Sequence, residues 1–419
     1  MKARKRVIIV GGGFGGLSAG KALADVRDLD VLVIDRRNHH LFQPLLYQVA
    51  MAGLSPAEIS MPIRSIFRRK PHVQVKMADV LKVNASSLTT SAGEFPFDYL
   101  ILACGSEHSY FGHDEWEDFA PGLKTLEQAT EIRRRVLTAF ERAETLPREE
   151  QKKFLTFVIV GGGPTGVELA GALGEITRFT LSEDFRHINP SVTRVILVEA
   201  GERVLAAFHP ELSKRAQRDL EALGVQIWTG CRVSQVNAEG VQIGAEFVEA
   251  RTVIWAAGVK PSPLNSQLES ELDKSGRVIV SSDCSLPSRP NVFVIGDQAA
   301  FRTVNGSFLP GLAPVAIQQG RFAAEQIRRE LNGSSRETFH YLDKGQMATI
   351  GRKRAVLEVG RLRMGGFFAW WAWLLIHIYY LIGFKNRFFV IWEWAFSYLT
   401  YRRGARLITR RDWHSRGAE

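Results

Sequence analysis

Two glycine-rich segments of the chain have a spacing that suits the binding of phosphate groups. Each follows a short apolar run, 7–10 in the first case and 157–160 in the second. The first glycine of such a segment permits a tight turn, the second lets the backbone approach a pyrophosphate, and the third lets a helix pack closely on its strand. The helix that follows presents unpaired N–H groups to the phosphates. The glycines with this Gly-x-Gly-x-x-Gly spacing are Gly11, Gly13 and Gly16, and Gly161, Gly163 and Gly166.

Each glycine segment is followed by a second apolar run that ends in an acid. These runs are 31–35, which ends in Asp35, and 195–199, which ends in Glu199. A carboxylate at this position binds a ribose hydroxyl of a dinucleotide. The glycine spacing alone is a weak signal, and two glycine-rich turns in an unrelated sheet protein are the alternative. A strand, glycine turn, helix and acid that occur together twice favour two dinucleotide-binding domains.

Later apolar runs predict further strands for the same two sheets. Residues 99–105 and 252–258 match each other, since both end in small residues and a glycine, and 291–297 ends in Gly-Asp. The pattern predicts an α/β fold with two Rossmann-like domains, the second inserted into the first. The polar stretch 179–191 is interpreted as an insertion in the second domain. The predicted ranges are 1–119 and 266–335 for the first domain, 120–265 for the second, and 336–419 for a C-terminal region that opens with a short strand-rich piece.

The positive charge of the chain is concentrated near its C-terminus. The 419 residues include 54 Lys and Arg and 44 Asp and Glu, which gives a net charge of +10. Residues 351–419 hold 13 basic and 4 acidic residues, a surplus of 9, together with six of the nine Trp. A basic segment so rich in aromatic side chains favours an anionic membrane surface over nucleic acid as a partner.

The cysteines and the N-terminus exclude several classes of protein. Cys104, Cys231 and Cys284 lie far apart and form no Cys-x-x-Cys pair. This pattern argues against a disulfide framework, a zinc ribbon or a redox dithiol, and no metal site is predicted. The apolar run near the N-terminus is too short for the core of a signal peptide, so the body of the protein is expected in the cytoplasm.

The C-terminal region contains two long apolar runs. The first, 364–384, is 21 residues long with His377 as its only strongly polar residue, so its length alone would allow it to span a bilayer. However, its Trp and Tyr residues are spread through the middle, a second run follows at 388–401, and basic residues flank both runs. Two amphipathic helices in the membrane interface are therefore expected, and a buried dimer interface is the alternative use of this surface. The headgroup contacts are assigned to Arg402, Arg403 and Arg406.

Several segments together resemble the type II NADH dehydrogenases, which are single-subunit NADH:quinone oxidoreductases that do not pump protons. The resemblance covers essentially the whole chain and rests on Gly11–Gly16, 41–49, 161–169, Gly296-Asp297 and 313–320. It implies FAD at the first glycine segment and NADH at the second. It also implies a two-step cycle that feeds a respiratory chain, in which NADH reduces the flavin and the flavin then reduces a membrane quinone. A homodimer held on one leaflet, at the cytoplasmic face of the inner membrane, is expected from the same resemblance.

The nucleotide-binding residues follow from the motifs and from the resemblance. Glu199 favours NADH because a carboxylate repels a 2′-phosphate, and Arg203 weakens this inference only slightly. Asp297 is expected near the ribityl-phosphate part of FAD, with a helix N-cap as the alternative. Lys385 is assigned to the flavin by the resemblance, and a lysine at a membrane interface is the alternative. The other residues assigned to the two nucleotides are Phe14, Gly15, Arg36, Gln43, Pro44, Val80, Gly105, Ala316 and Ile317 for FAD, and Thr165 and Gly258 for NADH.

Glu168 is the predicted catalytic residue. It lies near the start of the helix after the second glycine segment, where the helix dipole is expected to favour the ionised carboxylate. A solvated first-turn glutamate is the alternative from sequence alone. The resemblance implies that Glu168 holds the nicotinamide or relays protons to the quinone.

Gln318 and Gln319 are assigned to the quinone. Neutral amides can hydrogen-bond a quinone carbonyl without adding charge to an apolar pocket. The polar face of a surface helix is the alternative for Gln319. The chain departs from the family at Pro314, where many members have a glutamine, and this puts one quinone contact in doubt.

Two other functions remain as alternatives. The first is another membrane-associated oxidoreductase that uses FAD and NAD(P)H, such as a sulfide:quinone type, but that chemistry needs neighbouring cysteines. The second is a nucleotide-sensing membrane adaptor without turnover, since binding motifs by themselves do not establish a reaction.

Overall fold

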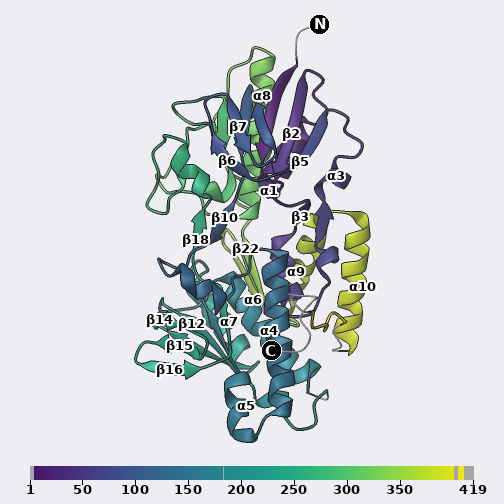
Figure 1. Cartoon of the computed structure of the whole chain (residues 1–419), viewed down its shortest axis with the longest axis vertical. Helices are drawn as coiled ribbons and strands as arrows, with labels where there is room; N and C mark the ends of the chain where they lie inside the picture. The colour runs from purple at the N-terminus through teal and green to yellow at the C-terminus, as the bar shows by residue number, and fades with distance from the viewer. Residues whose placement is uncertain (1–3, 183, 401–403, 410–419) are drawn as a thin grey trace. The chain divides into compact units, whose positions relative to one another are not determined.

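The computed structural model describes residues 4–182, 184–400 and 404–409, without the side chains of 384 and 397–400. The chain forms two compact units, each built from three segments (Figure 1). Unit 1 comprises Met1–Leu41, Ser60–Glu107 and Val259–Lys344, and unit 2 comprises Phe42–Ile59, His108–Gly258 and Gly345–Glu419. The domain ranges expected from the sequence stay a prediction.

Unit 1 is built on a parallel sheet of five strands in the order β20-β9-β1-β2-β5. Its strands are nearly continuous runs of Val, Ile and Leu, as expected for a parallel sheet covered on both faces. The strands are β1 (Lys5–Val10), β2 (Leu29–Asp35), β5 (Val73–Met77), β9 (Tyr99–Leu102) and β20 (Val292–Val294). The smaller strands of the unit are β3 (His39–Leu41), β4 (Ser60–Pro62), β6 (Val80–Val83), β7 (Ser87–Thr90), β8 (Gly93–Pro96), β18 (Val259–Pro261), β19 (Val278–Ile279) and β21 (Ala299–Ala300).

Two helices of unit 1 cross at very short distance. These are α1 (Phe14–Leu23) and α8 (Ala313–Leu331). A Cβ atom added to Gly320 would lie 2.2 Å from the carbonyl oxygen of Gly15, so a glycine is required at this crossing. The contact holds the start of α1 against the first turns of α8.

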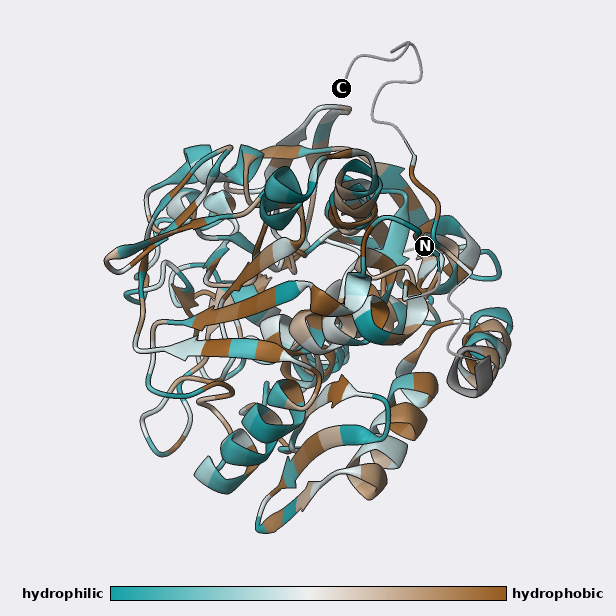
Figure 2. Cartoon of the chain, turned by 90° about the horizontal axis from the view of Figure 1, so that it is seen from below, coloured by the Kyte–Doolittle hydropathy of each residue, from teal (hydrophilic) through white to brown (hydrophobic). Residues whose placement is uncertain are grey.

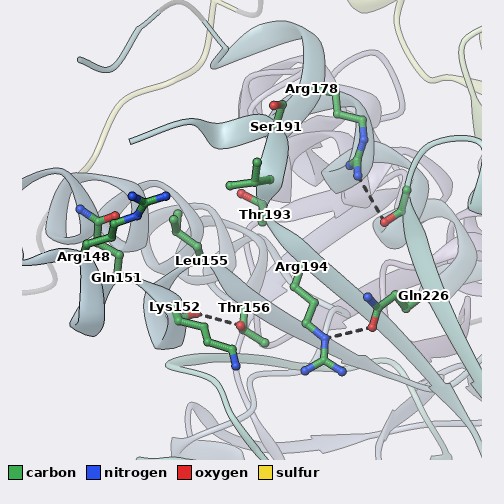
Figure 3. A pocket seen from close by; sticks show the side chains of 12 residues that line it. Arg148, Gln151, Lys152, Leu155, Thr156, Arg178, Ser191, Thr193, Arg194 and Gln226 are labelled. Carbon is green, nitrogen blue, oxygen red and sulfur yellow. Dashed lines mark hydrogen bonds between the residues drawn. The ribbon is translucent and has the colours of Figure 1, made fainter. Parts of the chain in front are cut away.

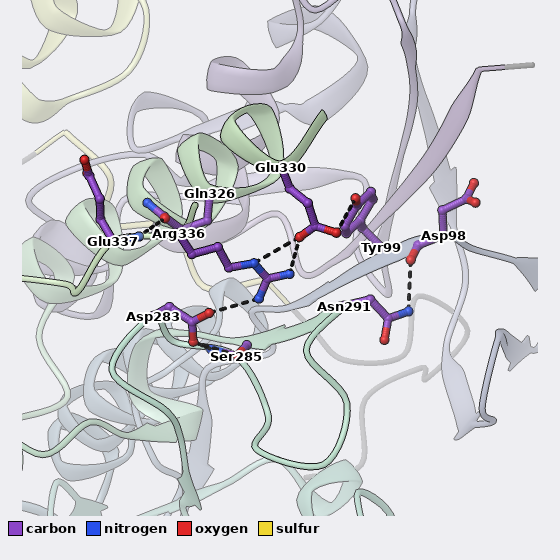
Figure 4. A network of polar contacts seen from close by, with 9 residues as sticks. All are labelled: Asp98, Tyr99, Asp283, Ser285, Asn291, Gln326, Glu330, Arg336 and Glu337. Carbon is purple, nitrogen blue, oxygen red and sulfur yellow. Dashed lines mark hydrogen bonds and ion pairs between the residues drawn. The ribbon is translucent and has the colours of Figure 1, made fainter. Parts of the chain in front are cut away.

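A network of charged side chains ties α8 to the sheet of unit 1 (Figure 4). Arg336 forms ion pairs with Asp283 at 2.9 Å and with Glu330 at 2.5 Å. The Tyr99 hydroxyl donates a hydrogen bond of 2.9 Å to Glu330, which joins α8 to β9. Each charge in the network has an opposite partner, so the arrangement serves to position these elements.

Unit 2 has a parallel sheet of four strands in the order β13-β12-β11-β17. Buried aromatic rings line its core, where the Trp255 ring packs against those of Tyr110 and Trp116. Figure 2 shows several strands of the chain largely in the brown of hydrophobic residues. The elements are β11 (Thr156–Val160), β12 (Arg194–Glu199), β13 (Val225–Thr229), β17 (Thr252–Trp255), β14 (Val233–Val236), β15 (Gly240–Ile243), β16 (Glu246–Glu249), α2 (Leu46–Ala50), α4 (Leu126–Thr145), α5 (Arg148–Phe154), α6 (Pro164–Glu175) and α7 (Pro210–Glu221).

The predicted strand-rich piece is an antiparallel sheet of three strands in unit 2. It consists of β22 (Gln346–Gly351), β23 (Arg354–Val359) and β24 (Leu362–Gly365). A Cβ atom added to Gly171 of α6 would lie 1.7 Å from the carbonyl oxygen of Ile350. The backbone of β22 therefore packs directly on α6.

The two apolar runs form two helices, α9 (Phe367–Tyr380) and α10 (Phe384–Thr400). Within the described residues, no helix reaches the combination of length and apolar character needed to cross a bilayer. One side of the pair docks on the unit, since the Trp394 indole donates a hydrogen bond of 2.7 Å to Gln48. Phe368 and Tyr379 are exposed on the other side, at 74% and 71%.

The arginines predicted to contact lipid headgroups divide into two groups. Arg402 and Arg403 lie outside the described residues. Arg406 forms an ion pair with Asp184, in the predicted insertion. This pairing ties the chain after α10 to the body of unit 2.

Candidate active site

The first glycine segment forms a tight turn at the carboxyl end of β1. Gly11 has a φ of +102°, and its N–H donates a hydrogen bond of 2.8 Å to Ile34. A Cβ atom added to Gly16 would lie 1.8 Å from the carbonyl oxygen of Gly11. The strand, turn and helix therefore approach so closely that side chains are excluded at both glycines.

The space beside this turn fits a pyrophosphate. A Cβ atom added to Gly13 would meet no atom within 4 Å among the described residues. Gly13 is also the N-cap of α1, and the helix start has neither a side-chain cap nor an acid in its first turn. The N–H groups of the first turn are therefore available to an anion. An FAD pyrophosphate fits this cradle.

Asp35 closes the cradle at the end of β2. Its carboxylate accepts hydrogen bonds from the N–H groups of Gly12, at 2.6 Å, and Arg37, at 2.7 Å. A carboxylate has about four acceptor positions, so these two bonds leave capacity for a ribose hydroxyl. His40 lies behind the turn, and its Nδ1 donates to the Gly12 carbonyl at 2.8 Å. Burial lowers the pKa of His40 to about 4, which keeps the ring neutral.

The Gly-Asp pair of unit 1 lies after β20, next to β9 in the sheet. Asp297 accepts a hydrogen bond of 2.7 Å from the Ser106 hydroxyl. The pair forms a short 3₁₀ turn whose N-cap is Ile295, so the alternative that Asp297 is an N-cap is wrong. The N–H of Gly296 donates to the Gln319 side chain at 2.8 Å.

The two predicted quinone residues both bind backbone groups of unit 1. Gln319 is 1% exposed and accepts the hydrogen bond from Gly296. Gln318 donates to the Leu342 carbonyl at 2.9 Å and accepts from the Leu342 N–H at 3.0 Å. Pro314 lies in the first turn of α8, where a missing N–H costs no helical hydrogen bond, so the departure from the family pattern is compatible with the helix.

The second glycine segment repeats the first in unit 2. Gly161 has a φ of +109°, and a Cβ atom added to Gly166 would lie 1.8 Å from the carbonyl oxygen of Gly161. A Cβ atom on Gly163 would again meet no described atom within 4 Å. Glu199 accepts hydrogen bonds from the N–H groups of Gly162, at 2.6 Å, and Gly201, at 2.7 Å. A second dinucleotide fits this cradle.

Glu168 lies near the start of its helix, as expected, but it differs from the expectation in charge. It lies in the second turn of α6 and is half-buried. Burial raises the pKa of Glu168 to about 8, and a hydrogen bond from the Thr349 backbone opposes this increase. The expected ionisation by the helix dipole is therefore wrong, because burial under β22 outweighs it. Gly171 is the sequence signal for this burial that was missed, because a glycine on α6 allows the backbone of β22 to pack directly on the helix.

The other predicted residues lie on several elements of the two units. In unit 1, Val80 begins β6, and Arg36 pairs with Glu107 at 3.2 Å. In unit 2, Gln43 donates to the Lys124 carbonyl at 3.5 Å, and Lys385 lies 5.7 Å from the centre of the Phe389 ring. The remaining positions are Phe14, Gly15, Gly105, Ala316 and Ile317 in unit 1, and Pro44, Thr165 and Gly258 in unit 2.

Sequence reasoning did not identify the residues that hydrogen-bond to the first glycine turn, to Asp297 and to Glu168. They are His40 behind the first turn, Ser106 beside Asp297 and Thr349 beside Glu168. His40 follows the acid of β2 by five residues, and this short spacing was an available signal. Ser106 and Thr349 are distant in sequence from their partners, so no local pattern identifies them.

Comparisons with known proteins agree with this geometry. Residues 5–320 match the family described as pyridine nucleotide-disulphide oxidoreductase, and residues 344–403 match the NDH2 C-terminal domain. The type II NADH:quinone oxidoreductase Ndh of Mycobacterium tuberculosis is 43% identical to the chain, over 97% of the chain and 90% of that protein.

Two solved structures have the same fold. NDH2 of Plasmodium falciparum in complex with NADH has a TM-score of 0.88 at 19% identity, over 96% of this chain and 99% of that chain. The sulfide:quinone oxidoreductase of Aquifex aeolicus has a TM-score of 0.74 at 18% identity, over 91% of each chain. With two matching cradles in the structure and a close relative over nearly its whole length, the chain belongs to the type II NADH:quinone oxidoreductases, within the pyridine nucleotide-disulphide oxidoreductase family.

Proposed function

We propose that unit 1 binds the FAD and unit 2 binds the NADH of this enzyme. As a member of its family, the chain is an FAD-dependent NADH:quinone oxidoreductase. The bound flavin supplies the chemistry that takes electrons from NADH and gives them to a quinone. The observation that supports this assignment of sites is the pair of matching cradles, each with free space beside its second glycine.

The FAD-binding groups are proposed to lie at the carboxyl ends of the unit 1 strands. The N–H groups at the start of α1 bind the pyrophosphate, and Asp35 binds a ribose hydroxyl. Asp297, oriented by Ser106, binds the ribityl-phosphate region. Val80, Ala316 and the other unit 1 residues assigned to FAD from the resemblance remain part of the proposal. Gln43, Pro44 and Lys385 are also kept as FAD assignments, although they belong to unit 2.

Glu199 is proposed to select NADH over NADPH. Its two carboxylate oxygens are held by N–H groups of the glycine turn and of the loop after β12. A carboxylate fixed in this way binds a ribose diol and repels a 2′-phosphate. Arg203 instead donates to the Ala206 carbonyl at 2.8 Å.

Glu168 is proposed to carry a proton during the reaction. Reduction of a quinone to the quinol consumes two protons, so a group that is protonated at neutral pH is a suitable donor. The raised pKa of Glu168, about 8, meets this requirement, because burial favours the neutral acid. The Thr349 N–H stabilises the carboxylate after the proton has left and so keeps the group able to cycle.

Gln318 is the proposed quinone contact, and Gln319 is proposed to support it. Gln318 is partly exposed, and its amide is held in one orientation by two bonds to Leu342. Gln319 is buried and fixes the N–H of Gly296. Together they give the first turns of α8 a defined polar surface.

The aromatic face of α9 and α10 is proposed to bind an anionic lipid surface. Members of this family are peripheral membrane enzymes. Phe368, Tyr379 and Trp392 are exposed, although a soluble surface rarely exposes large apolar groups together. The cytoplasmic face of the inner membrane and a homodimer that uses part of this surface complete the proposal.

Anaerobic reduction of the purified holoenzyme tests the assignment of function. NADH is expected to bleach the flavin absorbance, and a soluble quinone is expected to restore it. Glu199→Gln is expected to retain bleaching by NADH and to gain bleaching by NADPH. Failure of NADH to bleach the flavin would support an adaptor without turnover.

The sulfide:quinone alternative has no support in the cysteines. Cys104, Cys231 and Cys284 are all free, and burial raises the pKa of Cys104 to about 12, so that its thiol stays protonated. A thiol of this kind is a poor nucleophile. Sulfide is therefore expected to leave the flavin oxidised, and rapid bleaching by sulfide would favour the alternative.

A further inference from the structure

A pocket in unit 2 lies at the opposite end of the sheet from the NADH cradle. It encloses about 540 Å³ and is lined by residues from α5, from the starts of β11 and β12, and from the predicted insertion (Figure 3). Thr156 and Arg194 are the first residues of β11 and β12, whereas Gly161 follows the last residue of β11. Five residues of strand place the two ends about 16 Å apart. The pocket is therefore distinct from the dinucleotide site.

The pocket is strongly basic. Four cationic side chains line it: Arg148, Lys152, Arg178 and Arg194. Neither Asp nor Glu is among the lining residues, and none of the four cations has a carboxylate partner within the described part of the chain. This differs from the Arg336 network, in which both acids and the arginine are paired. Four unpaired cations around one cavity repel each other unless an anion binds there.

Two buried polar groups of the pocket have no hydrogen-bond partner among the described residues. Thr193 is 3% exposed, and its hydroxyl is unpaired. Arg178 has an unpaired buried Nη1 atom, while its Nη2 donates to the Gly224 carbonyl at 3.4 Å. Unpaired buried polar groups are rare in native proteins, so each of these two calls for an explanation.

Two of the arginines that line the pocket, Arg178 and Arg194, are held in defined positions. Gly224 makes room for Arg178, since a Cβ atom there would lie 1.7 Å from the guanidinium. Arg194 donates to Gln226 at 2.9 Å and lies 5.4 Å from the centre of the Trp228 ring. The hydrogen bond of Arg178 to Gly224 and that of Arg194 to Gln226 each use one N–H group of the guanidinium, so further N–H groups are left for a ligand.

We propose that this pocket binds a ligand with two or more phosphoryl groups. Guanidinium groups bind phosphate oxygens in pairs, and a nearby hydroxyl donates to a further oxygen. Four cations exceed what a single phosphate or carboxylate would need, and the volume admits a nucleoside polyphosphate. A lipid headgroup that carries a diphosphate offers the same chemistry, and the experiment separates the two sources.

Calorimetric titration of the FAD-loaded enzyme with inorganic tripolyphosphate tests the proposal. Saturating NAD⁺ is present, so that the dinucleotide cradle is occupied. We expect one site per chain, and the double variant Arg148→Gln/Lys152→Gln is expected to weaken binding by about tenfold or more. Both side chains are exposed, so the variant is expected to fold. Arg142→Gln/Lys214→Gln, two exposed cations outside the pocket, is the matched control and is expected to bind normally.

Three further outcomes decide the proposal and the source of the ligand. Equal loss of affinity in the control variant would show non-specific attraction and overturn the site. Absence of binding beyond that of sulfate at equal ionic strength would also overturn it. Tight binding of adenosine triphosphate but not of a short-chain diacylglycerol pyrophosphate identifies a soluble ligand, and the reverse identifies a lipid headgroup. Bleaching by NADH is measured in parallel, so that failure of the proposed function is recognised separately.

Discussion

The two glycine cradles have nearly the same backbone but are covered by different elements. Gly11 and Gly161 have φ values of +102° and +109°, and Gly105 and Gly258, after the neighbouring strands, have +71° and +69°. In unit 1 the helix α1 is crossed by another helix, which approaches at Gly15. In unit 2 the helix α6 is crossed by the strand β22, which approaches at Gly171.

The element that crosses each helix determines the surroundings of the polar side chain on that helix. When residues are counted from the first glycine of each glycine segment, the eighth residue is Ser18 in unit 1 and Glu168 in unit 2. Ser18 donates a hydrogen bond of 2.7 Å to the Phe14 carbonyl within its own helix. Glu168 accepts a hydrogen bond from the Thr349 backbone of β22, and partial burial raises its pKa. Under the proposed function, the glycines bind the two nucleotides, while the covering element determines whether a titratable group is buried on the helix.

The largest effect is expected when a methyl group is added to the third glycine of a cradle, where helix and turn are in close contact. Gly166→Ala puts a Cβ atom 1.8 Å from a backbone oxygen, and such overpacking costs roughly 3 kcal/mol. We expect reduced thermal stability and loss of NADH oxidation, measured by calorimetry and by steady-state kinetics. Gly16→Ala has the same clash in unit 1, and it is expected to release FAD. Loss of FAD from both variants alike would contradict the assignment of one nucleotide to each unit.

A smaller change fills the space beside the cradle without straining the backbone. Gly163 has a φ of −71° that alanine adopts readily, and its Cβ atom would meet no described atom. Gly163→Ala is therefore expected to leave the unfolding temperature unchanged and to raise the KM for NADH by about tenfold, because the methyl group displaces a phosphate. An unchanged KM would show that the pyrophosphate lies elsewhere.

Glu168→Gln tests the proton chemistry through its pH dependence. The folded pKa of about 8 lies above the ordinary value of 4.5, so folding takes up a proton and the stability of the wild type falls as pH rises from about 4.5 to 8. The glutamine variant lacks this decrease. We expect equal unfolding temperatures near pH 4.5 and a variant that is more stable by roughly 1–3 kcal/mol at pH 9.

Kinetics of the same variant separate a proton role from a structural one. Quinone reduction is expected to fall by about 100-fold or more, while anaerobic bleaching of the flavin by NADH stays rapid. Equal slowing of both half-reactions would point to a role in holding the nicotinamide.

The smallest effect is expected at the matching position of unit 1. Ser18→Ala removes a hydrogen bond to a carbonyl that already accepts within the helix, so stability is expected to change by less than about 0.5 kcal/mol. FAD content and the pH profile are expected to match those of the wild type. A shift of the pH profile would show that Ser18 takes part in proton transfer.

The sequence alone predicts much of the fold because its signals are local. Gly11, Gly13 and Gly16 with Asp35 define strand, turn, helix and acid within 25 residues, and the pattern repeats at Gly161. The same rule predicts strands at 99–105 and 252–258, and these strands pair with β1 and β11 respectively. The two apolar runs of the C-terminal region form two helices.

The local environment of Glu168 was not predictable in this way. The dipole of α6 favours the carboxylate, whereas packing that includes β22, about 180 residues later in the chain, partly buries it. Ser106 and Asp297, which are 191 residues apart, meet for the same reason. The amino-acid order thus determined the two cradles and their acids, because each is made by neighbours along the chain. Tertiary packing decided the protonation of Glu168 and the unpaired basic pocket, because burial and opposing charge depend on residues that come together only in the folded protein.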